Sequence, residues 1–289
     1  MIPALFARLC DDAAVFPPGR MPLRDAVPAH LRHRKARYGG LVGPLVVPAD
    51  ALSELRTLLD PADRLDHAER LDLAVTLPAW PRLVPSVLAG FAALPVRLDA
   101  LEVAMPEAYE TVKVFAALER TLDACPNTAV FVEIPRDDRV GDSIAECARH
   151  GYRAKLRTGG MSADLYPGEA ELAGRITALV DAGVPFKATA GLHHGVRNTD
   201  LATGFEQHGF LNLLLAVDAA LRGAGAQALA TVLAERDAGT IARRIAGLDG
   251  DAVAAVRARF LSFGTCSIRE PVEDLVELGL VRVGAGVPR

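Results

Sequence analysis

The sequence has few lysines, cysteines and aromatic residues, and each shortage excludes a class of protein. Only four of its 32 basic residues are lysines, so arginine carries the surface charge. Its four cysteines include no C-x-x-C pair, which indicates neither a disulfide framework nor a structural zinc site. Aromatic residues make up 5% of the chain and the formal net charge is −4, both unlike a nucleic-acid-binding protein. We therefore expect a small-molecule ligand and a reducing compartment.

Long hydrophobic runs are also missing. No run reaches the roughly 18 apolar residues of a membrane span, and residues 1–8 lack the basic and apolar regions of a signal peptide. The hydrophobic fraction of 51% over 289 residues is nevertheless ample for a buried core. These features predict a cytoplasmic protein with no membrane partner, organised as one domain over residues 1–289.

Short apolar segments alternate with helical stretches along the whole chain, and several of the segments end at a proline. The predicted strands are 13–16, 41–48, 71–78, 100–106, 128–135, 152–156, 186–189 and 260–263, and the helical stretches between the earlier ones include 22–37, 50–59 and 107–124. Eight apolar strands alternating with helices predict an α/β fold, a (β/α)8 TIM barrel whose chemistry lies at the carboxyl ends of its strands. An open doubly wound sheet is the alternative, but no G-x-G-x-x-G or Walker sequence follows any strand.

The connection between the predicted seventh and eighth strands is much longer than the others. Residues 209–221 are apolar enough for a buried helix, and the alanine-rich stretches 227–234 and 240–259 have good helix propensity. We therefore expect a helical insertion over about residues 195–259. It would serve either as a lid over the barrel mouth or as the surface of a homodimer.

Two lysines stand in the middle of predicted strands that break into glycine a few residues later. These are Lys155, before Gly159, and Lys187, before Gly191. Because the chain otherwise favours arginine, a lysine in a strand indicates a need for an amine that can lose its proton. Two amines on neighbouring strands would lower each other's pKa, and a neutral amine attacks carbonyl groups. Either lysine alone could be a strand-end residue reaching solvent, but the pair favours catalysis.

Three short motifs around these lysines resemble a known family. They are Lys155-x-x-Thr158-Gly159, Phe186-Lys187-x-x-x-Gly191 and the run from Ser262 to Ser267, which includes Gly264. In this order they resemble the deoxyribose-phosphate aldolase family of class I aldolases, which are (β/α)8 barrels. The resemblance implies a lyase that makes or breaks a carbon–carbon bond without a metal or other cofactor.

The resemblance also implies roles for single residues. Lys155 would form the Schiff base with the substrate, and Lys187 would lower the pKa of Lys155. Glu102 stands where the family has an aspartate used in proton transfer, and a carboxylate inside the barrel suits a general acid or base. It could instead only neutralise a lysine. Candidates for holding a substrate phosphate are Gly191, Gly264 and Ser267.

Further polar residues follow the same strands. Glu133 could orient a lysine or a substrate hydroxyl. Arg157 points to the same face as Lys155 and could clamp a carboxylate or phosphate, or pair with a surface acid. Thr158 and Gly159 match the family pattern.

Two adjacent histidines, His193 and His194, depart from the family pattern. They could bind a polar group of the substrate or act as acid and base near neutral pH. If the segment stays extended, at most one of them enters the site, since adjacent residues of a strand face opposite ways.

Two other functions remain open from the sequence. One is a metal-dependent barrel enzyme that uses His193 or His194 with Glu102 and Glu133 as ligands. The other is a non-catalytic binder of an anionic metabolite, clamped by the lysines and Arg157. In the leading hypothesis the partner is a small carbonyl compound that bears a phosphate or a carboxylate.

Overall fold

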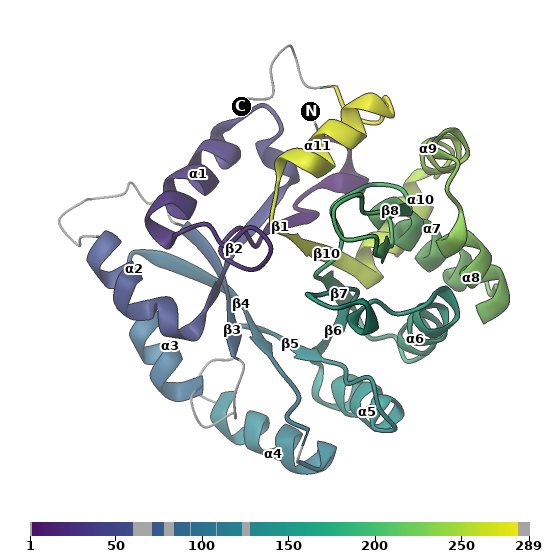
Figure 1. Cartoon of the computed structure of the whole chain (residues 1–289). Helices are drawn as coiled ribbons and strands as arrows, with labels where there is room; N and C mark the ends of the chain where they lie inside the picture. The colour runs from purple at the N-terminus through teal and green to yellow at the C-terminus, as the bar shows by residue number, and fades with distance from the viewer. Residues whose placement is uncertain are drawn as a thin grey trace.

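Eight parallel strands close into a barrel in the computed structural model, which describes residues 2–59, 71–77, 84–92, 94–107, 109–122 and 128–282 (Figure 1). In chain order the barrel strands are β1 (Cys10–Asp12), β2 (Val42–Pro48), β3 (Leu71–Leu77), β4 (Val96–Val103), β5 (Ala129–Glu133), β6 (Arg153–Arg157), β7 (Phe186–Thr189) and β10 (Phe260–Thr265). Each strand pairs with its neighbour in the chain, and β1 closes the ring between β10 and β2. The predicted (β/α)8 barrel is confirmed.

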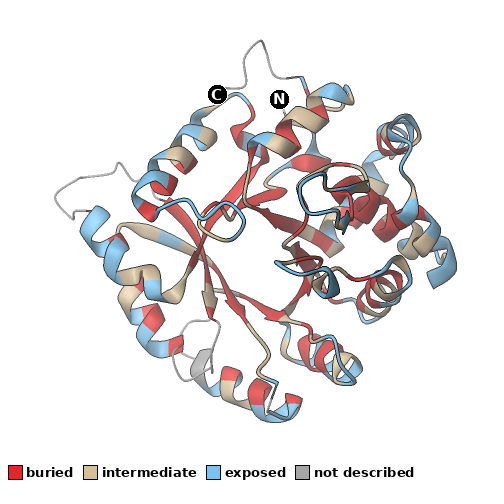
Figure 2. Cartoon of the chain, in the orientation of Figure 1, coloured by how far each residue is buried: buried red, intermediate tan, exposed pale blue. Residues whose placement is uncertain are grey.

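Helices surround this ring and cover its outer face. They are α1 (Leu23–Lys35), α2 (Leu52–Leu58), α3 (Val84–Ala92), α4 (Thr111–Leu122), α5 (Val140–His150), α6 (Glu169–Asp181) and α11 (Arg269–Glu277). Outward-facing strand residues such as Leu101 and Leu156 are fully buried against the helices. Figure 2 shows the strands and the inner faces of the helices as buried, so the main core is the layer between them.

The insertion between β7 and β10 contains a small ribbon followed by four helices. The ribbon pairs β8 (Asn198–Thr199) with β9 (Glu206–Gln207), and the helices are α7 (Phe210–Leu221), α8 (Ala226–Ala234), α9 (Ala238–Ala246) and α10 (Gly250–Arg259). The first eight residues of α7 are buried on every side, because this helix is covered by its neighbours as well as by the barrel. The predicted helical insertion is confirmed.

Several predicted boundaries differ from the structure. The first strand is Cys10–Asp12, whereas residues 13–16 form a turn in which the Phe16 amide donates to the Ala13 carbonyl at 2.9 Å. Asp11 and Asp12 lie on this first strand, and both are buried and paired. Pro78, Ala124 and Cys125, which belonged to earlier predictions, lie outside the described residues.

The predicted helix over 240–259 is two helices, α9 and α10. They are separated at Gly247, and Asp249 starts the second by accepting a hydrogen bond from the Ala252 amide at 2.8 Å. Within α1, which its basic composition predicted to be a solvated helix, His30 is buried and bonds Asp12 at 3.0 Å.

Ion pairs occupy the amino-terminal end of the barrel. Arg97 contacts Asp72 at 2.7 Å and Asp99 at 2.9 Å, while Arg8 contacts Asp72 at 3.0 Å and also bonds Asp99. Above these ion pairs, the barrel interior is filled by the apolar side chains of Val46, Ala74, Ala100 and Phe131. The space left for a ligand therefore lies at the carboxyl ends of the strands. Among the described residues, no helix combines the length and the apolar character that crossing a bilayer would require.

Candidate active site

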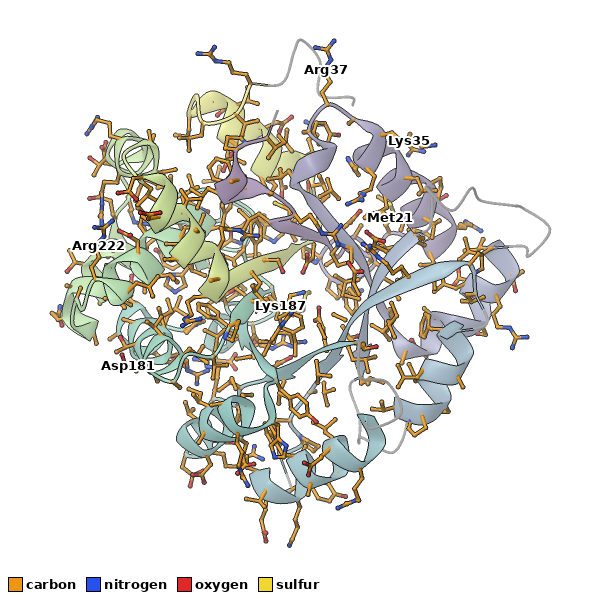
Figure 3. The ribbon with its side chains drawn as sticks, turned by 180° about the vertical axis from the view of Figure 1, so that it is seen from behind. Met21, Lys35, Arg37, Asp181, Lys187 and Arg222 are labelled. Carbon is orange, nitrogen blue, oxygen red and sulfur yellow. The ribbon has the colours of Figure 1, made fainter. Side chains whose placement is uncertain are left out.

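The two strand lysines are direct neighbours inside the barrel. Lys155 on β6 and Lys187 on β7 are register partners, and Glu133 on β5 is the partner of Lys155 on its other side. Both lysine side chains are buried, and Figure 3 shows Lys187 inside the ring of strands. The predicted pair of interior lysines is thus present.

Glu102 on β4 bridges the two ammonium groups. Its Oε1 lies 2.5 Å from Lys187 Nζ, and its Oε2 lies 3.2 Å from Lys155 Nζ. Lys187 Nζ also donates to Asp11 Oδ2 at 2.5 Å, and Lys155 Nζ lies 2.9 Å from Glu133 Oε2. Each lysine therefore has two carboxylate partners, one of which it shares with the other lysine.

The contacts continue at both ends of this arrangement. Arg157 Nε donates to Glu133 Oε1 at 2.8 Å, and Ser262 Oγ donates to Asp11 Oδ2 at 2.7 Å. Three carboxylates and three cations alternate, so the group is neutral as a whole when all six are ionised. We call these six residues the charge network, in the order Asp11, Lys187, Glu102, Lys155, Glu133 and Arg157.

The pKa values of the network follow from these partners. Burial alone would raise the pKa of Glu102, but Lys187 and Lys155 outweigh it and lower the pKa to about 2. Lys155 and Arg157 likewise outweigh burial and lower the pKa of Glu133. For Lys187, burial would lower the pKa, but Asp11 and Glu102 outweigh burial and raise it. The sequence-based expectation of a lowered pKa at Lys187 is wrong, because it considered the two amines without their carboxylates.

Asp11 is the residue of the network that the sequence did not suggest. Burial raises the pKa of its carboxyl group, while Lys187 and Ser262 oppose the increase. Its Oδ1 has no hydrogen-bond partner among the described residues. The available signal was the pair Asp11-Asp12 directly before the predicted first strand, residues 13–16.

A cavity of about 560 Å³ opens above the charge network. Glu102, Lys155 and Lys187 lie at its base, and its apolar lining residues include Phe16, Leu77, Leu165, Tyr166 and Phe205. Phe205 lies in the segment between β8 and β9. Its ring packs against that of Tyr166, with 5.3 Å between the two ring centroids. The segment between β8 and β9 is therefore part of the pocket wall.

The substrate-binding residues that the motif resemblance suggested divide into two groups. Gly191 and Gly264 line the cavity, whereas Thr158, Gly159 and Ser267 lie behind its wall. Thr158 Oγ1 donates to the Ala190 carbonyl at 2.6 Å and so ties the loop after β6 to the loop after β7.

The two other residues behind the wall have structural contacts as well. A Cβ at Gly159 would lie 2.8 Å from Gly191 Cα, so these two backbones need glycine for their close approach. Ser267 Oγ accepts a hydrogen bond from the Glu270 amide at 3.4 Å, at the start of α11. The side chains of Thr158 and Ser267 therefore do not line the cavity in this structure.

Both predicted histidines line the cavity. The chain leaves its extended conformation after β7, where Ala190 and Gly191 have φ values of 64° and 70°, so the alternation expected of a strand does not apply. His193 Nδ1 lies 3.0 Å from Glu270 Oε2, and His194 Nδ1 lies 3.2 Å from Asp274 Oδ2. The His193 side chain is 14% exposed and that of His194 is 45% exposed, so His193 is the more enclosed of the two.

The alternative metal site is not formed by the four residues suggested for it. Glu102 and Glu133 bind the lysines, whereas the two histidines bind acids of α11. In the part of the chain that the structure describes, no group of three His, Cys, Asp or Glu side chains is arranged to hold a metal ion.

Comparisons with known proteins provide little further information. No protein-family model matches the sequence, and no curated protein matches it significantly. The crystal structure of DHDPS from Cyanidioschyzon merolae with lysine bound is similar, with a TM-score of 0.39 and 11% identity over 96% of this chain and 99% of that one. This likeness is too weak to carry an argument, so the fold and the site rest on their own geometry. The motif resemblance to the deoxyribose-phosphate aldolase family is supported by none of these comparisons.

Proposed function

We propose that the protein is a class I, aldolase-type lyase that forms an imine between Lys155 and a small carbonyl substrate, and then makes or breaks a carbon–carbon bond. The observation that carries this proposal is the position of Lys155 Nζ, at the base of a cavity and within 3.2 Å of two carboxylates, Glu102 and Glu133. An amine in this setting has both a route for substrate and groups that accept its proton.

The charge balance of the network favours an imine over other uses of the lysine. A protonated imine on Lys155 carries one positive charge, as the ammonium does, so the network stays neutral when the covalent intermediate forms. Because charges in a buried site are costly unless paired, this conservation of charge keeps the intermediate stable. The positive nitrogen also withdraws electrons from the substrate, which is the purpose of imine catalysis.

The reaction can be followed through its proton transfers. Lys155 gives its proton to Glu133, the neutral amine adds to the carbonyl carbon, and the resulting carbinolamine loses water to give the iminium. In the cleavage direction a base removes the proton of the β-hydroxyl group, the Cα–Cβ bond breaks, and its electron pair forms an enamine. Protonation of the enamine at Cα and hydrolysis then release the second product. Glu133 is suited to these transfers because it is less enclosed than Glu102.

Lys187 has a different role in this proposal. Its two contacts of 2.5 Å with Asp11 and Glu102 hold it as an ammonium, so it acts as a fixed cation rather than as a nucleophile. By occupying one oxygen of Glu102, it reduces the negative charge that Lys155 experiences.

A non-catalytic binder of anions has weaker support. Each cation of the network already has a carboxylate partner, so an anion would have to compete with it. The Nη atoms of Arg157 are the exception, since they have no partner among the described residues and Arg157 lines the cavity. They are suited to hold a carboxylate or phosphate that the carbonyl substrate carries.

Borohydride trapping tests the proposal. The full-length protein is incubated with a panel of small aldehydes and ketones, reduced, and digested for peptide mass spectrometry. We expect a reduced adduct on Lys155 that is absent from Lys155→Arg, a variant that keeps the positive charge but cannot form the imine. Lys113→Arg, at an exposed lysine, is the matched control and should keep the adduct. An adduct confined to Lys187, or equal labelling of wild type and Lys155→Arg, would contradict the proposal.

A further inference from the structure

A thiol, an imidazole and a carboxylate meet at the cavity wall, outside the charge network. Cys266 Sγ lies 3.8 Å from His193 Nδ1, which lies 3.0 Å from Glu270 Oε2. All three residues line the cavity, and the proposed imine chemistry uses none of them. We call them the thiol cluster.

Cys266 differs from the other cysteines that the structure describes. Cys10 and Cys147 are fully buried, and burial raises the pKa of both thiols, that of Cys147 to about 12. Cys266 lies just beyond the end of β10 and is partly exposed. It is therefore the described cysteine that a molecule in the cavity can reach.

We propose that Cys266, with the His193 imidazole 3.8 Å from its sulfur, is a nucleophile that adds to α,β-unsaturated carbonyl compounds bound in the cavity. This goes beyond the proposed lyase activity and does not require an imine at Lys155. A thiolate beside an imidazolium is reactive at neutral pH, and an unsaturated carbonyl is a soft electrophile that thiolates prefer. The apolar lining of the cavity, including Phe16 and Phe205, suits the hydrocarbon part of such a compound.

The addition balances without any further reactant. The sulfur of Cys266 forms a bond to the β-carbon, the electrons of the carbon–carbon double bond move toward the carbonyl oxygen, and His193 gives its proton to the α-carbon of the enolate. The product is a saturated thioether with the carbonyl group restored, and His193 ends neutral.

The charged groups around His193 favour its protonated form. Burial would lower the pKa of His193, but Cys266 and Glu270 outweigh it and raise the pKa to about 10. Asp200, between β8 and β9, also interacts with His193: hydrogen bonds from Thr203 lower the pKa of the Asp200 carboxyl group, and the His193 imidazole adds to this effect. A protonated His193 is thus available at neutral pH to stabilise the thiolate.

The test compares cyclohex-2-enone with cyclohexanone, which lacks the reactive double bond. The full-length protein is incubated with each compound between pH 5.5 and 9, and thioether formation is followed by peptide mass spectrometry. We expect cyclohex-2-enone to modify Cys266 at pH 6 at least about tenfold faster than it modifies glutathione, because glutathione has no imidazole beside its sulfur as Cys266 has. Cyclohexanone should leave the residue unmodified.

Three variants decide the outcome. His193→Gln should slow the addition at least about tenfold, whereas His194→Gln, its matched neighbour bound to Asp274, should stay within about twofold of wild type. Lys155→Arg should also stay within about twofold, which separates this inference from the proposed imine. Equal rates in wild type and His193→Gln, loss of addition in Lys155→Arg, or a rate no faster than that of glutathione would each overturn it.

Discussion

Asp11 and Lys187 form a buried ion pair, and the same chain contains an exposed pair for comparison. Lys187 Nζ lies 2.5 Å from Asp11 Oδ2, with side chains only 2% and 4% exposed. Lys113 Nζ lies 2.9 Å from Glu110 Oε1, with side chains 65% and 71% exposed. The two pairs have the same chemistry, but removing one partner leaves an uncompensated buried charge only in the first.

Asp11→Asn should therefore be strongly destabilising. Breaking a buried pair by removing one partner costs about 3–5 kcal/mol, whereas an exposed pair contributes at most about 1 kcal/mol. We expect urea unfolding to show a loss in this larger range for Asp11→Asn and a loss below about 0.5 kcal/mol for Glu110→Gln. Similar losses in the two variants would mean that Asp11 does not hold Lys187 as a buried ammonium.

At the scale of single residues, the sequence predicted the lysines better than their surroundings. Lys155 and Lys187 were identified because lysines are rare in this arginine-rich chain and both stand within apolar segments, whereas Glu102 was identified through the motif resemblance. The raised pKa of Lys187 could not be predicted, since it depends on Asp11, which lies 176 positions earlier in the chain. Residues so far apart in the chain come into contact only because the barrel closes. Such a contact therefore produces no pattern in the sequence near either residue.

At the scale of elements, one side chain connects several parts of the insertion. Asn212, in α7, is fully buried, and its Nδ2 donates to the carbonyls of Val232 and Glu235 at 2.9 Å each. Its Oδ1 accepts a hydrogen bond from the Arg197 amide at 3.0 Å. Asn212 thus joins α7 to the end of α8 and to the segment that leads into the β8–β9 ribbon.

Asn212→Leu should loosen the insertion while leaving the barrel closed. The substitution preserves volume but leaves three backbone groups without their partner, at about 1–3 kcal/mol for each group that stays buried. We expect amide hydrogen exchange to show that the free energy of local opening in residues 195–235 falls by about 3 kcal/mol or more. Asn198→Ala, which removes a single 3.1 Å bond to the Val196 carbonyl, is the control and should cost less than about 1.5 kcal/mol. Unchanged protection in Asn212→Leu would show that these bonds do not hold the insertion in place.

The boundaries of helices and strands could be predicted where a periodic pattern of apolar residues extends over enough positions. The strands from β2 to β7 and the helices α1, α2 and α4 were found, because four or more residues in a regular pattern are readable from the sequence. The two-residue strands β8 and β9 were not found, since their pairing depends on the folded loop rather than on any alternation. The three-residue strand β1 was placed too late for the same reason.

At the scale of the whole molecule, both ends of the barrel contain charged groups, but with different consequences. Arg8 and Arg97 bind Asp72 and Asp99 beneath the apolar layer at the amino-terminal end. The charge network lies above that layer, at the base of a cavity. The ion pairs therefore close the amino-terminal end of the barrel, whereas the charge network faces the cavity.

Glu102 should make the stability of the whole molecule depend on pH. Its pKa is lowered from the usual 4.5 to about 2, so its ionised form stabilises the folded state by about 3 kcal/mol above pH 4.5. This contribution is lost as the pH falls from about 4.5 to about 2. Urea unfolding of wild type and Glu102→Gln at a series of pH values measures this effect. We expect the difference between their free energies of unfolding to become smaller as the pH falls from about 4.5 to about 2. A difference that stays constant would contradict the lowered pKa.

The general architecture could be predicted because it repeats along the chain. Eight strand–helix alternations are a local signal repeated many times, so an error at one boundary, as at β1, does not change the result. The cavity could not be predicted, because the residues that line it come from many separate loops. The same reason left the thiol cluster unnoticed, although both His193 and the run that contains Cys266 had been singled out.

The placement of Asp11 on the first strand has a consequence for the newly made chain. Asp11 leaves the ribosome long before Lys187, and the two meet only when β1 takes its place between β10 and β2. Until then Lys187 lacks one of its two carboxylate partners. Closure of the barrel and completion of the charge network are thus a single event, which takes place only after β10 has been synthesised.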